Sequence, residues 1–282
     1  MICQCARLME DGKIVFIGYG MPQIAAILAQ RLHAPRMVQM YEFGAVGPLP
    51  ETPFVRFTMG GPRNCYKSLA WTNMNTIFAQ AQLGMVDLGV LGATQIDQFG
   101  NINSTMLGSD YTHPEKRFPG SGGANEVLTQ CWRTVIIVMH ERRRFVKKVD
   151  FVTSPGYLDG TPGARERAGL PRGTGPWRVV TSKALYGFDE QSKRMSLLGV
   201  LRGASEAEVL KEMEFAPLVG ENVEELEPPT SEELRVLRHE IDPTRAIIGK
   251  TVRSCFRSRL CLATEKTAII ELREVHSCQE FF

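Results

Sequence analysis

The chain has 282 residues, a formal net charge of +2 and a hydrophobic fraction of 43%, which suits one large α/β domain or two small ones. A charge so close to neutral argues against a nucleic-acid footprint or a polybasic membrane surface. No apolar run approaches the ~18 residues that a membrane span requires, and no secretory signal opens the chain, so we expect a cytoplasmic protein.

The first apolar run, residues 13–18, predicts a buried strand that ends in a glycine. Pro22 suits the first turn of a helix, because its missing N–H would have no partner there. Apolar residues then recur at helical spacing, which predicts an amphipathic helix as far as about His33. Residues 37–41 form the next apolar run and predict a second strand.

Four further short runs, each bounded by Gly, Pro, Asp or Asn, predict strands over residues 86–91, 134–139, 151–153 and 178–181. Two capping boxes, Ser205-x-x-Glu208 and Thr230-x-x-Glu233, predict the starts of two helices near the C-terminus. Asp242-Pro243 ends the second helix.

This alternation of strands and helices predicts an α/β fold with an open, mostly parallel sheet flanked by helices. We assign residues 1–249 to this domain. Residues 250–282 have no clear period, and we expect a poorly ordered tail with little bearing on function. The seven cysteines are scattered and form no C-x-x-C pair, so neither a disulfide scaffold nor a metal site is expected.

Glu42 is the first candidate for chemistry, because it ends an apolar run just before Gly44. A carboxylate is costly to desolvate, so its position at the end of a buried strand indicates a functional role. The alternative is that it pairs with an arginine or faces water. Ligands gather at the carboxyl ends of parallel strands, and Glu42 stands at such an end.

Two glycine-rich segments are candidates for anion binding. Residues 18–22 join a strand to a helix with Gly18 and Gly20, either as an anion-binding turn or as a simple tight turn. Residues 120–123 contain three glycines and could present amide donors to an oxyanion, or could be a flexible linker.

Two polar segments could each have either a functional or a structural role. Residues 97–105 could line a pocket or simply build a turn. Residues 140–148 carry a basic run that could bind phosphate or an acidic partner, but a solvated charged face is the commoner explanation.

Taken together, these segments resemble the family I CoA-transferases, and within them the B (beta) subunits of the glutaconate type. The resemblance runs from about Cys5 to about Ile248. It is carried by residues 15–22, 42–44, 92–105, 116–125, 140–145 and 152–156, and is weakest over residues 45–85.

The resemblance implies that Glu42 is the nucleophile of a ping-pong transfer of CoA, with Phe43 where the family usually has Ser or Asn. It would pass through a glutamyl-CoA thioester. The implied oxyanion and CoA-binding residues are Gly120, Gly122, Gly123, Ala124 and Asn125. The implied pocket residues are Gly18, Gly20, Gln95, Asn103 and Ser104.

The resemblance also implies coenzyme A as the carrier, acyl-CoA and carboxylic acid substrates, and no metal. A homologous A subunit would complete the active site, commonly in a heterotetramer, and a glutaconate-type dicarboxylate is the expected acid. Two alternatives are a CoA-thioester hydrolase or decarboxylase on the same scaffold, and a non-catalytic acyl-CoA-binding protein.

Overall fold

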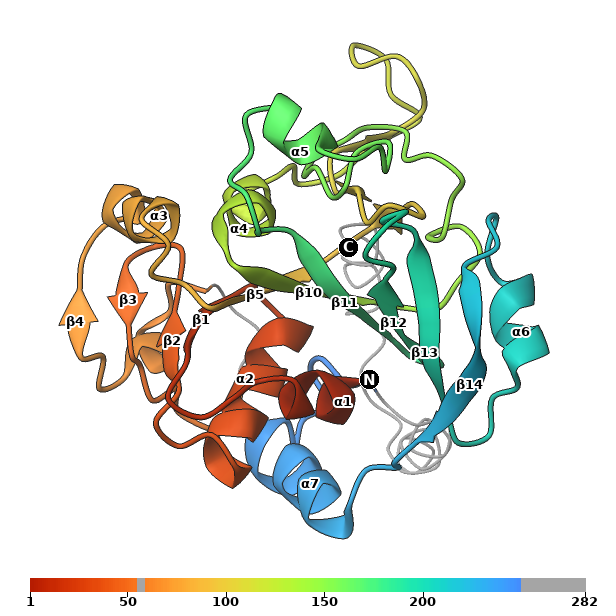
Figure 1. The fold of residues 1–282 in the computed structure, drawn as a ribbon. Coiled ribbons are helices and arrows are strands. Elements are labelled where there is room, and N and C mark those ends of the chain that lie inside the picture. The colour runs from red at the N-terminus through yellow and green to blue at the C-terminus, as the bar shows by residue number, and fades with distance from the viewer. Residues whose placement is uncertain (55–58, 250–282) are drawn as a thin grey trace, which may run out of the picture.

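The computed structural model describes residues 1–54 and 59–249. The expected C-terminal tail therefore lies outside the described residues. Ten strands form one sheet in the order β14-β13-β12-β11-β10-β5-β1-β2-β3-β4 (Figure 1). The predicted α/β class, with an open and mostly parallel sheet flanked by helices, is confirmed.

Five neighbouring strands form the parallel centre of this sheet. They are β11 (Pro176–Thr181), β10 (Arg133–Val138), β5 (Leu88–Gly92), β1 (Ile14–Ile17) and β2 (Val38–Met40). Each corresponds to a run predicted from the sequence. Their near-continuous apolar character follows from burial on both faces of the sheet.

Antiparallel strands extend the sheet at both ends. On one side lie β12 (Ala184–Phe188), β13 (Met195–Leu201) and β14 (Leu218–Leu226), of which β14 runs parallel to β13. On the other side lie β3 (Ala45–Val46) and β4 (Ala70–Trp71). None of these five was predicted. β3 and β4 have only two residues each and β14 is rich in acidic residues, so they carry little apolar signal, whereas the apolar runs of β12 and β13 were missed.

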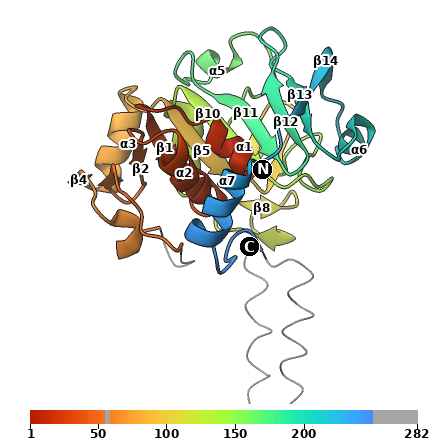
Figure 2. The same ribbon diagram turned by 90° about the horizontal axis from the view of Figure 1, so that it is seen from below.

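Helices cover both faces of the sheet and create two apolar cores. One face packs against α1 (Ile2–Arg7), α2 (Met21–Leu32) and α7 (Ser231–Arg235) with the π-helical turn Val236–Ile241, as Figure 2 shows. The other face packs against α3 (Met74–Gln82) and α4 (Ala124–Gln130). Successive residues of β1 alternate between the cores: Val15 and Ile17 in the first, Phe16 in the second.

Short elements complete the chain outside the main sheet. Two small hairpins pair β6 (Gln95–Ile96) with β7 (Ile102–Asn103), and β8 (Met106–Leu107) with β9 (Lys116–Arg117). The others are the 3₁₀ turn Pro62–Cys65, α5 (Ala164–Arg167) and α6 (Glu206–Lys211).

The predicted strand over residues 151–153 is wrong, whereas the helix boundaries near the C-terminus are confirmed. Residues 151–153 are irregular, and only Ser154 forms an isolated bridge, to Ile102. This apolar run lies against the hairpin of β6 and β7, and it meets only Ile102 of the two-residue strand β7, so the pairing does not extend along its length. Ser205 and Thr230 both form complete capping boxes, and the second helix ends before Asp242.

Position 44 requires a glycine because the backbone just after β2 passes very close to the backbone of Thr72. Its φ is +121°, and a methyl group added there would lie 2.1 Å from the carbonyl oxygen of Thr72. The N–H of Thr72 also donates to the Gly44 carbonyl over 2.9 Å. This contact joins the turn after β2 to the start of α3.

We predict that Gly44→Ala lowers the free energy of unfolding by about 2–4 kcal/mol, because it adds both backbone strain and a steric clash. Gly12→Ala is the matched control, since Gly12 has a φ of +73° but nothing within 4 Å of an added methyl group. It should cost only about 1 kcal/mol. Urea denaturation measures both values, and equal losses would contradict the steric argument.

Candidate active site

Glu42 lies in a tight turn at the carboxyl edge of the parallel strands. The turn between β2 and β3 is closed by the N–H of Gly44, which donates to the Tyr41 carbonyl over 2.9 Å. The N–H of Tyr41 donates to the Ala45 carbonyl, also over 2.9 Å. Glu42 is therefore a corner residue of the turn, and its side chain is partly buried.

The carboxylate of Glu42 lies against the glycine-rich loop that precedes α4. A methyl group added to Gly123 would lie 3.1 Å from Oε2 of Glu42, and one added to Gly122 would lie 3.7 Å from the same atom. Within the part of the chain that the structure describes, the Glu42 side chain has no hydrogen bond or ion pair. An acidic group at the strand edge is thus held against a loop of backbone amides.

The backbone donors of this loop divide into bonded and unbonded groups. The N–H of Gly120 donates to the Ser104 carbonyl over 3.0 Å, and that of Ala124 donates to the Ser121 carbonyl over 2.9 Å. The N–H groups of Gly122 and Gly123 have no partner among residues 1–54 and 59–249. These two donors, rather than those of Gly120 and Ala124, are free to bind an oxyanion.

Ser104 and Asn125 hold the glycine-rich loop in place. The Ser104 hydroxyl donates to the Gly120 carbonyl over 3.0 Å, and Nδ2 of Asn125 donates to the Thr153 carbonyl over 3.0 Å. Thr153 also accepts the backbone N–H of Ser104 at its hydroxyl oxygen. Thr153 was missed in the sequence as a residue of the site, because it was assigned to a strand.

Gln95 and Asn103 lie buried beneath this loop. Nδ2 of Asn103 donates to Oε1 of Gln95 over 2.7 Å, and Oδ1 of Asn103 accepts the N–H of Thr105 over 2.9 Å. Nε2 of Gln95 donates to Asp150 over 3.3 Å. Most of their polar atoms are thus used internally, which favours a role in supporting the loop over direct contact with a ligand.

Gly18 and Gly20 lie at the carboxyl end of the neighbouring strand, β1. The N–H of Gly18 donates to the Val90 carbonyl over 2.8 Å, so the space of a side chain is taken by β5. Gly20 has a φ of +85° and nothing within 4 Å of an added methyl group. Gly18 is therefore explained by close packing, whereas Gly20 borders open space.

Aromatic rings support both sides of the site, although no sequence pattern pointed to them. Phe43 packs between Tyr41 and Trp71, with ring centroids 5.9 and 5.8 Å away. Phe78 of α3 lies against the loop, where its Cζ would be 2.7 Å from a methyl group added to Gly123. Phe78 in turn stacks on Phe16 of β1, with centroids 5.9 Å apart.

Comparison with known proteins identifies the family of this chain. A protein-family model described as Coenzyme A transferase matches residues 1–211. The chain is 39% identical to the B subunit of glutaconate CoA-transferase from Acidaminococcus fermentans, over 86% of this chain and 91% of that protein. It is 34% identical to the B subunit of 3-oxoadipate CoA-transferase from Pseudomonas knackmussii, over 84% and 90%. The chain belongs to the coenzyme A transferase family.

The fold agrees with this assignment. The crystal structure of glutaconate coenzyme A-transferase from Acidaminococcus fermentans matches with a TM-score of 0.81 and 36% identity, and the match covers 89% of this chain and 96% of that one. Among residues 1–54 and 59–249, no group of three or more His, Cys, Asp or Glu is placed to hold a metal ion. No described helix is long and apolar enough to cross a membrane.

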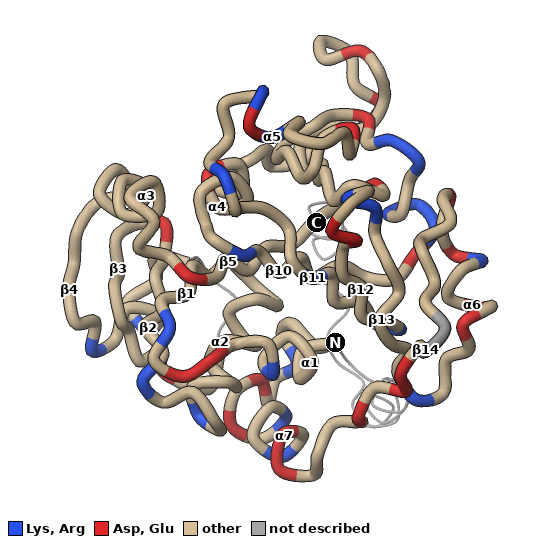
Figure 3. The backbone as a smooth tube through the Cα atoms, in the orientation of Figure 1, with Lys and Arg blue, Asp and Glu red and all other residues tan. Residues whose placement is uncertain are grey.

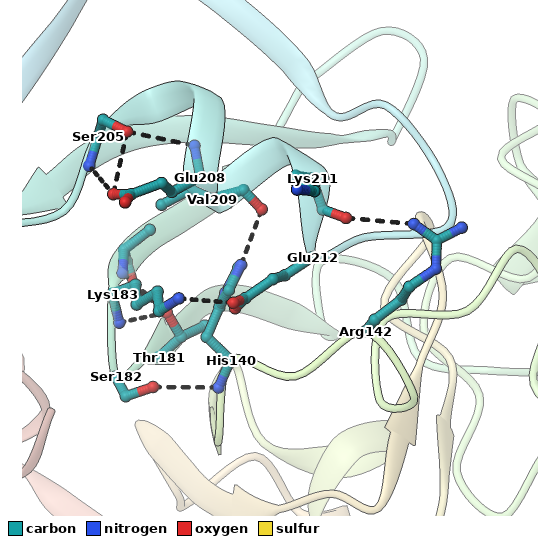
Figure 4. A network of polar contacts seen from close by, with 11 residues as sticks. His140, Arg142, Thr181, Ser182, Lys183, Ser205, Glu208, Val209, Lys211 and Glu212 are labelled. Carbon is teal, nitrogen blue, oxygen red and sulfur yellow. Dashed lines mark hydrogen bonds and ion pairs between the residues drawn. The ribbon is translucent and has the colours of Figure 1, made fainter.

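Within the basic run of residues 140–148, His140 and Arg142 are bonded to the neighbouring helix α6. Figure 4 shows Nη1 of Arg142 donating to the Lys211 carbonyl, over 3.1 Å, and Nε2 of His140 bonded to the Val209 carbonyl, over 2.9 Å. Arg143 and Arg144 both pair with Glu141. These contacts favour a structural role for the run, and Figure 3 shows acidic residues interspersed with basic ones along the chain.

His140 is a buried neutral side chain in this network. A carbonyl can only accept, so the Val209 bond places the proton on Nε2 and leaves Nδ1 without one. Nδ1 is buried and has no partner among the described residues. Protonation there would create an unsatisfied donor, and burial lowers the pKa of His140.

Asp97 is a buried carboxylate in the segment that joins β6 to β7. Its Oδ1 accepts the N–H groups of Phe99 and Asn101, and its Oδ2 accepts Nδ2 of Asn101 over 2.9 Å. Burial nevertheless outweighs these bonds and raises the pKa of Asp97 to about 6. Oδ1 of Asn101 accepts the N–H of Gly156, so this turn anchors the segment next to Thr153.

The raised pKa of Asp97 predicts a pH dependence of stability. Between the ordinary value of 3.8 and the folded value of about 6, the folded chain binds more protons than the unfolded chain. The contribution of Asp97 to the free energy of unfolding therefore falls as the pH rises through this window, by up to about 3 kcal/mol. Denaturation of wild type and Asp97→Asn from pH 4 to 6 measures the difference, and parallel curves would contradict it.

Proposed function

We propose that this chain is the B subunit of an acyl-CoA:carboxylate CoA-transferase in which Glu42 is the covalent nucleophile. The single observation that carries the proposal is the contact of the Glu42 carboxylate with Gly122 and Gly123, whose N–H groups have no partner among the described residues. Family membership supplies the reaction class.

The proposed ping-pong reaction consists of two half-reactions. An oxygen of the Glu42 carboxylate attacks the thioester carbonyl, the C–S bond breaks, and CoA leaves as the thiolate. The thiolate then attacks the glutamyl carbonyl of the resulting anhydride, which releases the first acid and leaves a glutamyl-CoA thioester. The acceptor carboxylate repeats these steps in reverse, which returns the Glu42 carboxylate and yields the new acyl-CoA.

Each attack creates a tetrahedral oxyanion that needs donors already in place. The N–H groups of Gly122 and Gly123 are suited to this role, since they lie next to the carboxylate at which two of the attacks occur. Losing one such donor typically costs about 3–4 kcal/mol in an enzyme. Partial burial of Glu42 also removes part of the hydration that makes a carboxylate a poor nucleophile.

The substrate and partner follow from the relatives. A glutaconate-type dicarboxylate is the proposed acid, because the glutaconate enzyme's B subunit is 39% identical over 91% of its length, against 34% for the 3-oxoadipate one. Both relatives are named as B subunits, so we propose a homologous A subunit as the partner, in a heterotetramer. Partial exposure of Glu42 leaves room for such a protein to complete the site.

We predict that Glu42→Ala lowers kcat of the reconstituted complex by at least about a thousandfold, because the covalent step is lost. Borohydride treatment in the presence of acyl-CoA should reduce a thioester at Glu42 in the wild type and give no labelled peptide in the variant. Glu51→Ala, which removes an exposed glutamate paired with Arg63, is the control and should retain activity.

Two outcomes would redirect this proposal. A Glu42→Ala complex that still forms free acid from acyl-CoA without an acceptor would favour a hydrolase on the same scaffold. A wild-type complex that binds acyl-CoA but never turns it over would favour a non-catalytic role.

We further predict that Gly123→Ala lowers kcat by about a hundredfold or more while acyl-CoA binding persists. The φ of Gly123 is −84°, which alanine adopts freely, so the added methyl group acts by pushing the loop away from Phe78 and Glu42. Gly220→Ala is the control, since nothing lies within 4 Å of its added methyl group. An unchanged kcat in Gly123→Ala would show that the glycine-rich loop takes no part in catalysis.

A further inference from the structure

Arg165 is a buried cation with no described carboxylate within 4.0 Å, although the exposed Glu166 next to it in the chain attracts it electrostatically. Only 6% of Arg165 is exposed. Its guanidinium forms no ion pair within residues 1–54 and 59–249, although many other arginines there meet a carboxylate within 4.0 Å. Burial lowers the pKa of Arg165, and a buried charge without a counter-ion is costly for a fold to retain.

The hydrogen bonds of Arg165 leave part of the guanidinium free. Nη1 donates to the carbonyls of Pro155 and Gly156, over 3.0 and 2.6 Å, and Nη2 donates to the Thr174 hydroxyl over 2.8 Å. Nε is buried and has no partner among the described residues. A guanidinium carries five N–H donors, so the Nε–H and one Nη2–H remain unused.

Gly175 lies over one face of this guanidinium rather than at its edge. A methyl group added to Gly175 would lie 3.2 Å from Cζ, 3.3 Å from Nε and 3.5 Å from Nη1 of Arg165. Because these three distances are so similar, position 175 lies over the plane of the guanidinium and not beside its edge. The planar edge is what binds carboxylate and phosphate oxygens.

Arg165 lines a cleft of about 230 Å³ that contains a second cation. Lys193 lines it from the loop between β12 and β13, where its Nζ lies 5.4 Å from the ring centroid of Tyr157. Arg167 lies near the rim and donates to the hydroxyl of Thr161, a residue of the lining. Glu166 is the acidic residue of the lining and is exposed, so the basic residues outnumber it.

We propose that this cleft is a binding site for a small oxyanion, a carboxylate or a phosphate group, held by the free donors of Arg165 and by Lys193. The oxyanion supplies the missing counter-ion and accepts the unused N–H groups. Glu42 and residues 120–123 are not part of the lining, so the site is separate from the proposed catalytic centre. The inference does not depend on the transferase activity.

Calorimetric titration of the full-length chain, alone and with its A-type partner, tests this site. Sodium phosphate and sodium acetate are titrated separately at constant ionic strength, which distinguishes the two sources of oxyanion. We expect saturable binding of at least one of them, a loss of about tenfold or more in affinity for Lys193→Ala, and no binding for Arg165→Gln. Lys211→Ala, which removes an exposed lysine on α6, is the matched control and should bind as wild type.

Arg165 also holds Pro155 and Gly156, so its substitution alone could unfold this region. Lys193→Glu therefore provides the second variant, because it reverses a charge on a partly exposed loop and should abolish binding without loss of fold. The proposal is overturned if the wild type shows no saturable binding of either anion. It is equally overturned if both Lys193 variants bind as tightly as wild type, since Arg165 would then serve only to anchor its own loops.

Discussion

The contact between the turn after β2 and the glycine-rich loop is the constraint on which the rest of the structure depends. It places the Glu42 carboxylate beside Gly122 and Gly123, whose N–H groups have no partner among the described residues, and it depends on close approaches at glycines. Gly44 lets the turn approach Thr72, and Gly123 lets the loop approach the carboxylate and Phe78. Gly122 has a φ of +47°, which favours glycine, but a methyl group there would only be in ordinary contact with the carboxylate. A methyl group at Gly44 or Gly123 would therefore force neighbouring atoms apart.

The scaffold behind this contact consists of buried polar groups rather than of apolar packing alone. Asn103, Ser104 and Thr153 connect the hairpin, the glycine-rich loop and the segment after residue 150 through satisfied hydrogen bonds. Such a network is costly if any member is lost, so it specifies one arrangement of the loop. Phe78 supports the same loop through the core that it shares with Phe16. The geometry of the proposed site and the stability of the fold are thus coupled here.

Sequence alone was sufficient for the parallel centre of the fold and for the positions of Glu42 and the glycine-rich loop. Both follow from local patterns: apolar runs that end at glycine, and three glycines followed by a segment able to form a helix. It was insufficient where partners come from distant segments. The strands β12 to β14 form by mutual pairing, and residues 151–153 do not form a strand because this segment meets only the two-residue strand β7, through one bridge at Ser154. In the same way, Gln95 and Asn103 use most of their polar atoms in hydrogen bonds to each other and to distant segments, which only tertiary contacts define.

Transfer of oxygen between the acid and the enzyme tests the central claim most directly. If Glu42 forms anhydrides on both sides of the reaction, an acceptor acid labelled with a heavy oxygen isotope must leave one labelled oxygen on the Glu42 carboxylate. Mass spectrometry of the peptide that contains Glu42, taken after turnover by the full complex, measures this label. We expect label at Glu42 and at no other carboxylate. Turnover to labelled acyl-CoA with an unlabelled Glu42 would contradict covalent catalysis by this residue.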